Sequence, residues 1–355
     1  MAISQVEEME LQNILRQVGL DQLKEGSLCI FAGAGISINS GIPRASKIIE
    51  YVVDQIFDDE QDKSLFLSPQ NKIPFEVFME LLFNNYQPPI SKSTWMKVVQ
   101  NFIKFNVVND NGNNFLHYQF FELFNSKEYQ PNSNHCFIAE MLRKGICSFA
   151  VTTNFDLMIE EAYKIITGKE LRVYFPKPGQ KIKYEFPCLL KLHGGCQDLG
   201  TIQTTLGKIV DKEAVAHCEA MVDYTFRNGK HSIVMVIGYS FSDVFDIIPA
   251  IERVNKSNIF NTIPILKKIC RPKKKIVKIS HSVEYPSSSP ICKLPFFQNF
   301  SGWEVKANTN AVISSLQELY PSEKPCPEPF STPEDSENID AENIDELIRD
   351  WAVGL

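Results

Sequence analysis

Two polar segments of the sequence carry residue types that could move a proton and hold a polar substrate. Residues 152–156 read Thr-Thr-Asn-Phe-Asp after an apolar stretch, and His193 follows another apolar stretch and precedes two glycines. An imidazole can accept a proton near neutral pH, and the side chains of Asn154 and Asp156 can orient a substrate or a water molecule. Together these residues predict a site for a reaction that needs a general base.

A glycine-rich turn predicts a ligand that carries phosphate. Gly33 and Gly35 follow the apolar residues 28–31, and Ser37 and the Gly-Ile-Pro triplet at 41–43 come next. Glycine lets backbone amides approach a phosphate because no Cβ stands in the way. A helix after the turn would direct its positive end at the same anion.

Simpler interpretations exist for both segments. Ile38 occupies the place of the third glycine in Gly-x-Gly-x-x-Gly, so the turn could be an ordinary tight turn, and the Gly-Lys-Ser/Thr of a P-loop is missing. Asn154 or Thr153 could be the N-cap of a helix, with Asp156 in its first turn. Helix capping does not account for the histidine after the next apolar stretch.

A further polar segment occupies residues 238–243, again directly after an apolar stretch. Gly238 and Ser240 could approach a ribose or a phosphate closely. Ser242 and Asp243 are explained equally well as helix-capping residues of a loop.

The periodicity of apolar residues predicts the elements that must position these side chains. Apolar strands are expected at 28–31, 146–152, 188–192, 232–237 and 275–280, and amphipathic helices at 5–24, 46–57, 135–144, 156–166 and 246–255. Alternating strands and helices predict an α/β fold with a Rossmann-like, doubly wound parallel sheet, whose ligands bind at the carboxyl ends of the strands. The four polar segments all follow strands, so we expect them at that edge.

The predicted domain organisation has three parts. Residues 1–25 form an amphipathic N-terminal helix, and residues 26–320 form the ligand-binding catalytic domain. Residues 58–135, which are rich in Phe, Asn and Gln, are expected to be a helical insertion in that domain. Residues 321–355 combine a linker that holds five prolines before residue 334 with an acidic amphipathic tail.

The charge and the cysteine content of the chain argue against several classes of function and of site. The net charge is −7, and the segment 321–355 contains ten Asp/Glu and two Lys/Arg, so the rest of the chain is near neutral and does not favour nucleic-acid binding. We interpret the basic run at 267–278 as a solvated edge strand. Nine scattered cysteines without a Cys-x-x-Cys pair argue against a zinc ribbon and a disulfide framework, and indicate buried free thiols in a reducing cytoplasm. No membrane segment and no secretory signal are expected.

Five ordered blocks make the chain resemble the sirtuin superfamily. They are Gly33-Ala-Gly-Ile-Ser37 with Ser40-Gly-Ile-Pro43, Pro131-Asn-x-x-His135, Thr153-Asn-Phe-Asp156, Leu192-His-Gly194 and Gly238-x-Ser240. The resemblance spans about residues 26–320.

The resemblance implies NAD+ as the substrate. It implies that the turn at 33–37 holds the pyrophosphate, that Asn154 and Asp156 contact the nicotinamide ribose and carboxamide, that His193 is the general base, and that Gly238 and Ser240 line the adenosine half. The implied catalytic residues are Asn154, His193 and Asp156. The implied NAD+-binding residues are Ala32, Gly33, Ala34, Gly35, Ser37, Gly41, Ile42, Pro43, Thr153, Asn154, Asp156, Gly238 and Ser240.

Departures from the sirtuin deacetylase pattern point to a subfamily. Deacetylases carry two Cys-x-x-Cys pairs for zinc after the catalytic histidine, and Asp-Phe-Arg after Gly-Ile-Pro, whereas this chain has no such pairs and reads Arg-Ala-Ser at 44–46. The chain is more similar to zinc-less sirtuin-like NAD hydrolases of bacterial anti-phage defence, with a helical insertion in place of the zinc ribbon. That resemblance implies an NAD+ glycohydrolase that needs no zinc and depletes NAD+ in abortive infection.

An enzyme that destroys NAD+ must be restrained until it is needed. The resemblance therefore implies a homo-oligomer, a regulatory protein partner, or both; the candidate partners are a defence-system ATPase, an Argonaute-like protein and a phage-derived trigger. Two other functions stay open: an NAD-dependent protein deacylase or ADP-ribosyltransferase, and a non-catalytic sensor or scaffold that binds NAD+ or ADP-ribose. Asn154 and His193 together favour catalysis, because a protein that only binds needs no base.

Overall fold

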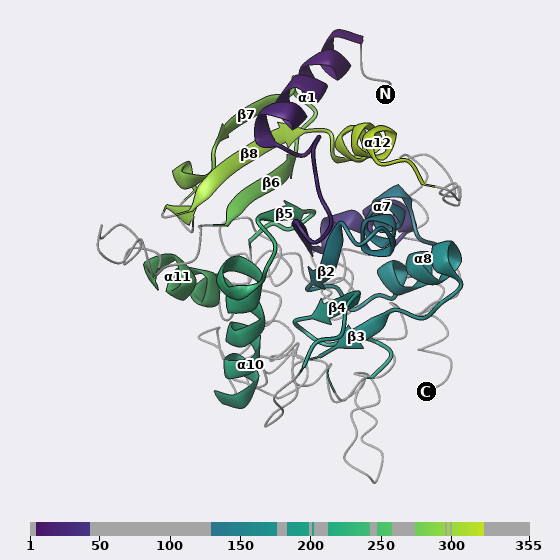
Figure 1. Ribbon diagram of the computed structural model, residues 1–355, viewed down its shortest axis with the longest axis vertical. Helices are drawn as coiled ribbons and strands as arrows, with labels where there is room; N and C mark the ends of the chain where they lie inside the picture. The colour runs from purple at the N-terminus through teal and green to yellow at the C-terminus, as the bar shows by residue number, and fades with distance from the viewer. Residues whose placement is uncertain are drawn as a thin grey trace, which may run out of the picture.

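A computed structural model describes residues 5–42, 129–175, 183–198, 201, 212–241, 247–257, 274–294, 297–298 and 300–322. Its centre is an eight-stranded sheet in the order β3-β4-β2-β1-β5-β6-β8-β7 (Figure 1). All neighbouring strands pair in parallel except β7 and β8, which are antiparallel. The predicted class, an α/β fold with a Rossmann-like parallel sheet, is confirmed.

The five predicted strands are present with small shifts of their ends, and three further strands extend the sheet. The predicted strands are β1 (Leu28–Ala32), β2 (Cys147–Thr152), β4 (Cys188–Lys191), β5 (Ile233–Ile237) and β6 (Lys275–His281). The additional ones are β3 (Arg172–Tyr174), β7 (Ser287–Pro290) and β8 (Ser301–Ala307). β3 is short and β7 is polar, so periodicity analysis does not reveal them, whereas β8 is seven residues long and contains Trp303, Val305 and Ala307 but was not predicted.

Helices cover both faces of the sheet, which explains the continuous apolar composition of the central strands. One face packs against α1 (Gln5–Val18), α7 (Ser133–Arg143), α8 (Met158–Thr167) and α12 (Thr309–Leu319) (Figure 1). The other face packs against α10 (Lys212–Asp223), the π-helical turn Tyr224–Asn228 and α11 (Ile247–Ser257). None of the described helices is long and apolar enough to cross a membrane.

The strand register places the predicted site segments side by side. Ala32, the last residue of β1, lies opposite Thr152 of β2 and Ile237 of β5, and Thr152 lies opposite Lys191 of β4. Four adjacent strands therefore end at the same level. The loops that contain Gly33, Asn154, His193 and Gly238 begin there, as predicted.

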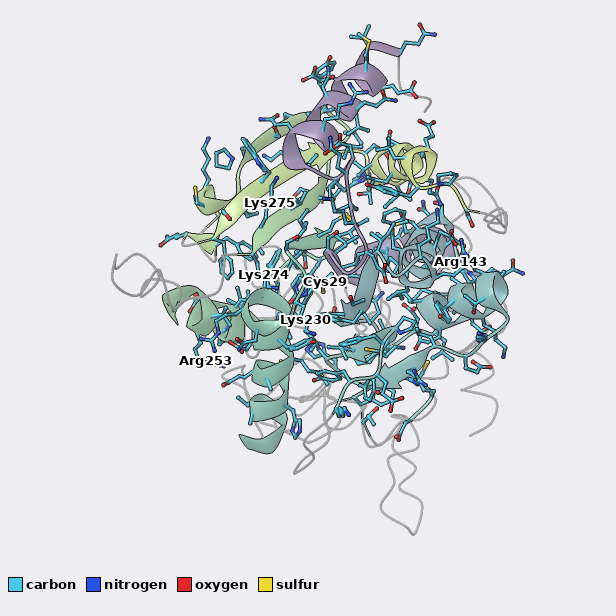
Figure 2. All side chains as sticks on the ribbon, viewed as in Figure 1. Cys29, Arg143, Lys230, Arg253, Lys274 and Lys275 are labelled. Carbon is cyan, nitrogen blue, oxygen red and sulfur yellow. The ribbon has the colours of Figure 1, made fainter. Side chains whose placement is uncertain are left out.

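The described part of the basic run, residues 274–278, does not form an edge strand, which corrects the expectation from sequence. β6 pairs with β5 on one side and β8 on the other, so it lies inside the sheet. Lys274 and Lys275 stand at its beginning (Figure 2). Lys274 is buried and donates to the carbonyl oxygens of Gly229 and His231, and Lys278 lies 3.3 Å from Glu304. Backbone carbonyl oxygens accept hydrogen bonds from Lys274, and the Glu304 carboxylate pairs with Lys278.

Cysteine usage agrees with the prediction at five of the seven described cysteines, whereas Cys292 is a free thiol that is exposed. Cys29, on the central strand β1 (Figure 2), Cys147, Cys188, Cys196 and Cys218 are buried free thiols. Cys136 forms a disulfide, which the scattered spacing did not predict.

Several predicted features fall outside the described residues. These are the helix at 46–57, most of the helical insertion at 58–135, the tail from residue 323 onward, and Pro43, Ser242 and Asp243.

The turns that follow β1 and β5 approach each other so closely that only glycine fits. A Cβ on Gly33 would lie 2.6 Å from the carbonyl oxygen of Gly238, and a Cβ on Gly238 would lie 2.6 Å from the amide nitrogen of Ile36. Gly238 also has a φ of +64°, a left-handed conformation that other residues adopt at a cost. The glycines thus lock two loops together at the edge where the site lies.

We expect Gly238→Ala to destabilise the protein more than Gly168→Ala. Both glycines have positive φ (+64° and +71°), but a Cβ on Gly168, which follows α8, would have no atom within 4 Å. Strain alone costs about 1–2 kcal/mol, and the collision at Gly238 adds about 1–3 kcal/mol. Urea unfolding of both variants measures the difference, and equal losses would show that the loops are not tightly packed.

Candidate functional site

The hydroxyl of Ser37 is the centre of a buried hydrogen-bond network. Its Oγ lies 2.9 Å from Oδ2 of Asp156, 3.0 Å from Nε2 of His135 and 3.1 Å from Nδ2 of Asn154. Asn154 Nδ2 also lies 3.2 Å from Asp156 Oδ2. All four side chains are at least nine-tenths buried. The sheet thus brings together residues from the loops after β1 and β2 and from the start of α7.

The chemistry of these groups fixes the direction of each hydrogen bond. A carboxylate only accepts, so Ser37 donates its single proton to Asp156. Ser37 must then accept from both His135 and Asn154. This arrangement orients the Asn154 amide with its nitrogen toward Ser37 and Asp156 and its oxygen on the opposite side. Asn154 Oδ1 is buried and has no hydrogen-bond donor among the described residues, so it can receive one from a ligand.

His135 is held by the beginning of α7. Asn132 is the N-cap: its side chain accepts from the amide of Asn134, and its own amide donates to Nδ1 of His135 at 3.1 Å. The Asn132 side-chain nitrogen donates to the carbonyl oxygen of Ile36 at 2.8 Å. The Pro-Asn-x-x-His block therefore links α7 to the glycine turn. The sequence pattern contains this block but gave no indication of a role for His135 at the site.

Burial sets the protonation state of His135. Desolvation lowers the pKa of His135 to about 4, although the nearby Asp156 carboxylate opposes the shift. The ring is therefore neutral at neutral pH. Because Nδ1 accepts a hydrogen bond from the Asn132 amide, the ring proton is on Nε2 and points at Ser37.

Asp156 has partners inside the protein on both carboxylate oxygens. Oδ2 accepts from Ser37 and Asn154, and Oδ1 accepts from the amide of Met158 at 3.1 Å. The side chain that binds a free amide at the start of α8 is therefore Asp156, and not Asn154 or Thr153. Asp156 positions Asn154, and its predicted contact with a nicotinamide carboxamide is left to the one remaining lone pair of Oδ1.

His193 packs against the loop that contributes Asn154 and Asp156 to this network. Its side chain is 6% exposed, and its ring stacks on Phe155 with ring centres 6.4 Å apart. Phe155 stands between Asn154 and Asp156 in the sequence, so the loop of the predicted base contacts the loop of the predicted positioning residues. The amide of Cys196 strengthens this contact by donating to the Phe155 carbonyl oxygen at 3.0 Å.

A buried lysine that the sequence pattern did not reveal contacts the backbone of the loop after β2. Lys191, the last residue of β4, has no exposed surface and lies 2.8 Å from Oε1 of Glu160 on α8. Its Nζ also donates to the carbonyl oxygens of Phe155 and Asp156. Burial raises the pKa of Glu160, and Lys191 opposes that shift. A lysine that ends an apolar strand is the sequence signal that could have identified this pair.

The glycine turn uses most of its amides internally. The amides of Gly33 and Gly35 donate to the carbonyl oxygens of Ile237 and Gly238, and those of Ile36 and Ser37 donate within the turn. Among the described amides from Gly33 to Ser37, only that of Ala34 has no backbone acceptor, and Ala34 is exposed. The turn can therefore offer a phosphate fewer amides than its glycine content indicates.

The remaining predicted residues surround this centre. Ala32 and Ile42 are buried, Thr153 donates its amide to the Ala32 carbonyl oxygen at 3.3 Å, and Gly41 ends the turn with a φ of +79°. On the other side of β1, Ser240 is exposed on the loop after β5.

Phe241 anchors that loop. It has a φ of +59°, and its ring packs edge-to-face on Phe297 with ring centres 5.2 Å apart. A strained residue held by packing is frequent where a loop must keep a fixed shape.

The described residues contain no group of three or more His, Cys, Asp or Glu that could hold a metal ion. A zinc-independent reaction remains a prediction.

We expect Lys191→Met to lower the free energy of unfolding by about 3–5 kcal/mol, because Glu160 would be left buried without its partner. Adding Glu160→Gln removes the unpaired charge, so the double variant should recover more than half of the loss. Chemical denaturation of the wild type, both single variants and the double variant measures the coupling. If the effects of the two substitutions on the free energy of unfolding were additive, Lys191 and Glu160 would not be energetically coupled.

Acid should destabilise the protein through its buried histidines. Burial lowers the pKa of both His135 and His231 from the usual 6.5 to about 4. Between these values the unfolded chain binds protons that the folded chain does not, so stability falls as the pH falls from about 6.5 toward 4. At about pH 5 His135 alone accounts for about 2 kcal/mol. Urea unfolding at about pH 7 and 5 should show a smaller loss for His135→Gln than for the wild type.

One part of the chain matches a known protein family. The SIR2-like domain family matches residues 148–260. This segment includes Thr153, Asn154, Asp156, His193, Gly238 and Ser240, whereas the glycine turn after β1 lies outside it. No curated protein matches the sequence.

Solved Sir2 structures are similar at low identity. One, described as a Sir2 homologue mutant in complex with 2′-O-acetyl ADP ribose, has 15% identity and a TM-score of 0.38, and covers 87% of this chain and 94% of that chain. Another, described as "Structural Basis for the Mechanism and Regulation of Sir2 Enzymes", has 16% identity and a TM-score of 0.38, and covers 90% and 98% of the two chains. Such low scores assign no activity. The similarity to the SIR2-like domain family is confined to residues 148–260.

Proposed function

We propose that this protein is an NAD+ glycohydrolase that cleaves the bond between nicotinamide and ribose and releases nicotinamide and ADP-ribose. The observation that carries the proposal is the Asn154 side chain, whose buried Oδ1 has no donor among the described residues, at the carboxyl edge of a parallel sheet. Ligands bind at this edge in doubly wound sheets. The SIR2-like match over residues 148–260 supports NAD+ as the substrate.

The reaction needs a positioned water molecule and a proton acceptor. The nicotinamide nitrogen takes the electron pair of the broken bond and leaves as a neutral molecule. The water oxygen forms the new bond to the anomeric carbon, and its proton passes to His193. The transition state resembles an oxocarbenium ion, as in other glycosyl transfers. Holding one water molecule while excluding the bulk solvent supplies much of the rate enhancement.

Each proposed role follows from a group that the network leaves available. Asn154 Oδ1 accepts a hydrogen bond from the attacking water or from a ribose hydroxyl, and its direction is fixed by Ser37 and Asp156. The exposed amide of Ala34 donates to the pyrophosphate. Gly238 and Ser240 approach the adenosine half from the loop on the other side of β1.

We further propose that this activity depletes NAD+ in anti-phage defence, under the control of an oligomer or a regulatory partner. This role is supported by the resemblance to zinc-less sirtuin-like NAD hydrolases and by the absence of Cys-x-x-Cys pairs from the sequence. An oligomer that releases nicotinamide from NAD+ while its separated monomers do not would agree with this role, and a monomer that is active constitutively would contradict it.

Asn154→Ala and His193→Ala should each lower nicotinamide release about 100- to 10,000-fold. Asn13→Ala, an exposed position on α1, is the matched control and should keep wild-type turnover. Nicotinamide release from NAD+ is followed by chromatography, and the melting temperature of each variant establishes that it is folded. Wild-type turnover in either site variant would contradict its assignment.

Incubation with NAD+ alone distinguishes hydrolysis from protein deacylation. A glycohydrolase releases nicotinamide without any acceptor, whereas a deacylase needs an acylated peptide and an ADP-ribosyltransferase needs an acceptor protein. We expect release with NAD+ alone and no increase when an acetyl-lysine peptide is added.

A further inference from the structure

We propose that His135 is a positioning residue that acts on the reaction through Ser37, by fixing which end of the Asn154 amide faces the substrate. This inference rests on the proposed function. The residue lies on α7, outside the segment that matches the SIR2-like family.

The position of the proton on the imidazole fixes the direction of its hydrogen bonds. Nδ1 of His135 accepts from the Asn132 amide at 3.1 Å, and a single ring proton remains for Nε2. Nε2 lies 3.0 Å from Ser37 Oγ. The ring is fully buried, so a charged form that could donate from both nitrogens is disfavoured. His135 Nε2 is therefore a hydrogen-bond donor to Ser37 and cannot act as an acceptor from it.

The donation from His135 determines what Ser37 can do. A hydroxyl oxygen has two lone pairs and one proton. His135 occupies one lone pair and Asn154 Nδ2 occupies the other, at 3.1 Å, while the proton goes to Asp156 at 2.9 Å. Without the histidine proton, Ser37 could rotate and donate elsewhere, and the amide of Asn154 would lose one of the two groups that orient it.

For the reaction, the orientation of the amide determines where Asn154 Oδ1 lies. Asn154 Oδ1 faces the substrate only while Nδ2 faces Ser37 and Asp156. A flipped amide would present a donor where a water molecule or a ribose hydroxyl must donate. An error of this kind in a positioned group costs about 10- to 100-fold in turnover. His135 acts without touching the substrate, so the loss should appear in kcat rather than in KM.

Two substitutions separate the role of each ring nitrogen. The side-chain oxygen of Asn can take the place of Nδ1, so His135→Asn keeps the contact with the Asn132 amide and loses the donor to Ser37. The side-chain nitrogen of Gln can take the place of Nε2, so His135→Gln keeps the donor to Ser37 and loses the helix-capping contact.

The two variants should therefore behave in opposite ways. We expect His135→Asn to lose about 10- to 100-fold in kcat with little change in KM and a melting temperature near that of the wild type. We expect His135→Gln to keep most of the turnover at a lower melting temperature. Wild-type kcat in His135→Asn, or equal losses of kcat in both variants, would overturn the inference.

A spectroscopic measurement tests the same inference without turnover. In protein labelled with 15N-histidine, His135 should give the signals of a neutral ring protonated on Nε2, and Ser37→Ala should shift the Nε2 signal. A ring protonated on Nδ1 would overturn the inference even in an active enzyme. A wild-type protein that releases no nicotinamide from NAD+ would count against the proposed function, whereas an active protein with a normal His135→Asn variant would count against the role of His135 alone.

Discussion

The candidate site depends on one hydroxyl group that has a single proton to donate. Ser37 donates this proton in a hydrogen bond to Asp156, and the directions of the other hydrogen bonds follow from that donation. His135 and Asn154 must both donate to Ser37, and Asn154 Oδ1 is left facing away from them. Groups from three separate parts of the chain thus hold one amide in a single orientation, and the low polarity of the surroundings makes any other arrangement costly.

The sheet makes this arrangement possible by placing β1 at its centre. β2 and β5 pair with opposite sides of β1 and end at the same level as it does. On the β2 side, the turn after β1 meets the polar residues of the network. On the β5 side, it meets Gly238 at a distance that admits no side chain. The same turn therefore performs two tasks, and tight packing on one side fixes the position of Ser37 for the other.

Sequence reasoning predicted the sheet and the loops of the site because both depend on local patterns. Apolar runs of strand length identified the central strands, and polar residues directly after them identified the loops that contain Asn154 and His193. The short strand β3 and the polar strand β7 carry no such pattern. β6 was placed at an edge because its lysines suggested solvent, whereas ion pairing with Glu304 allows Lys278 to lie inside the sheet. Partners of this kind are far apart in the sequence and become visible only in three dimensions.

The same limit applies to His135 and Lys191. Both are buried polar residues, and the role of each depends on the group that it contacts. His135 contacts Ser37, and Lys191 contacts Glu160. The role of the glycines was also only partly predictable. Their spacing indicated close backbone approach, which is correct, but the nearest backbone belongs to the loop after β5, and most amides of the turn are already bonded.

The central position of β1 also determines when the site can exist during synthesis. β1 ends at Ala32, yet Gly238, which locks the turn in place, is added about two hundred residues later. A nascent chain that lacks β5 leaves one side of β1 unpaired and Ser37 unsupported on that side. Contacts between such distant segments form late in folding. The ribosome must therefore finish most of the chain before any molecule can acquire the geometry of the candidate site.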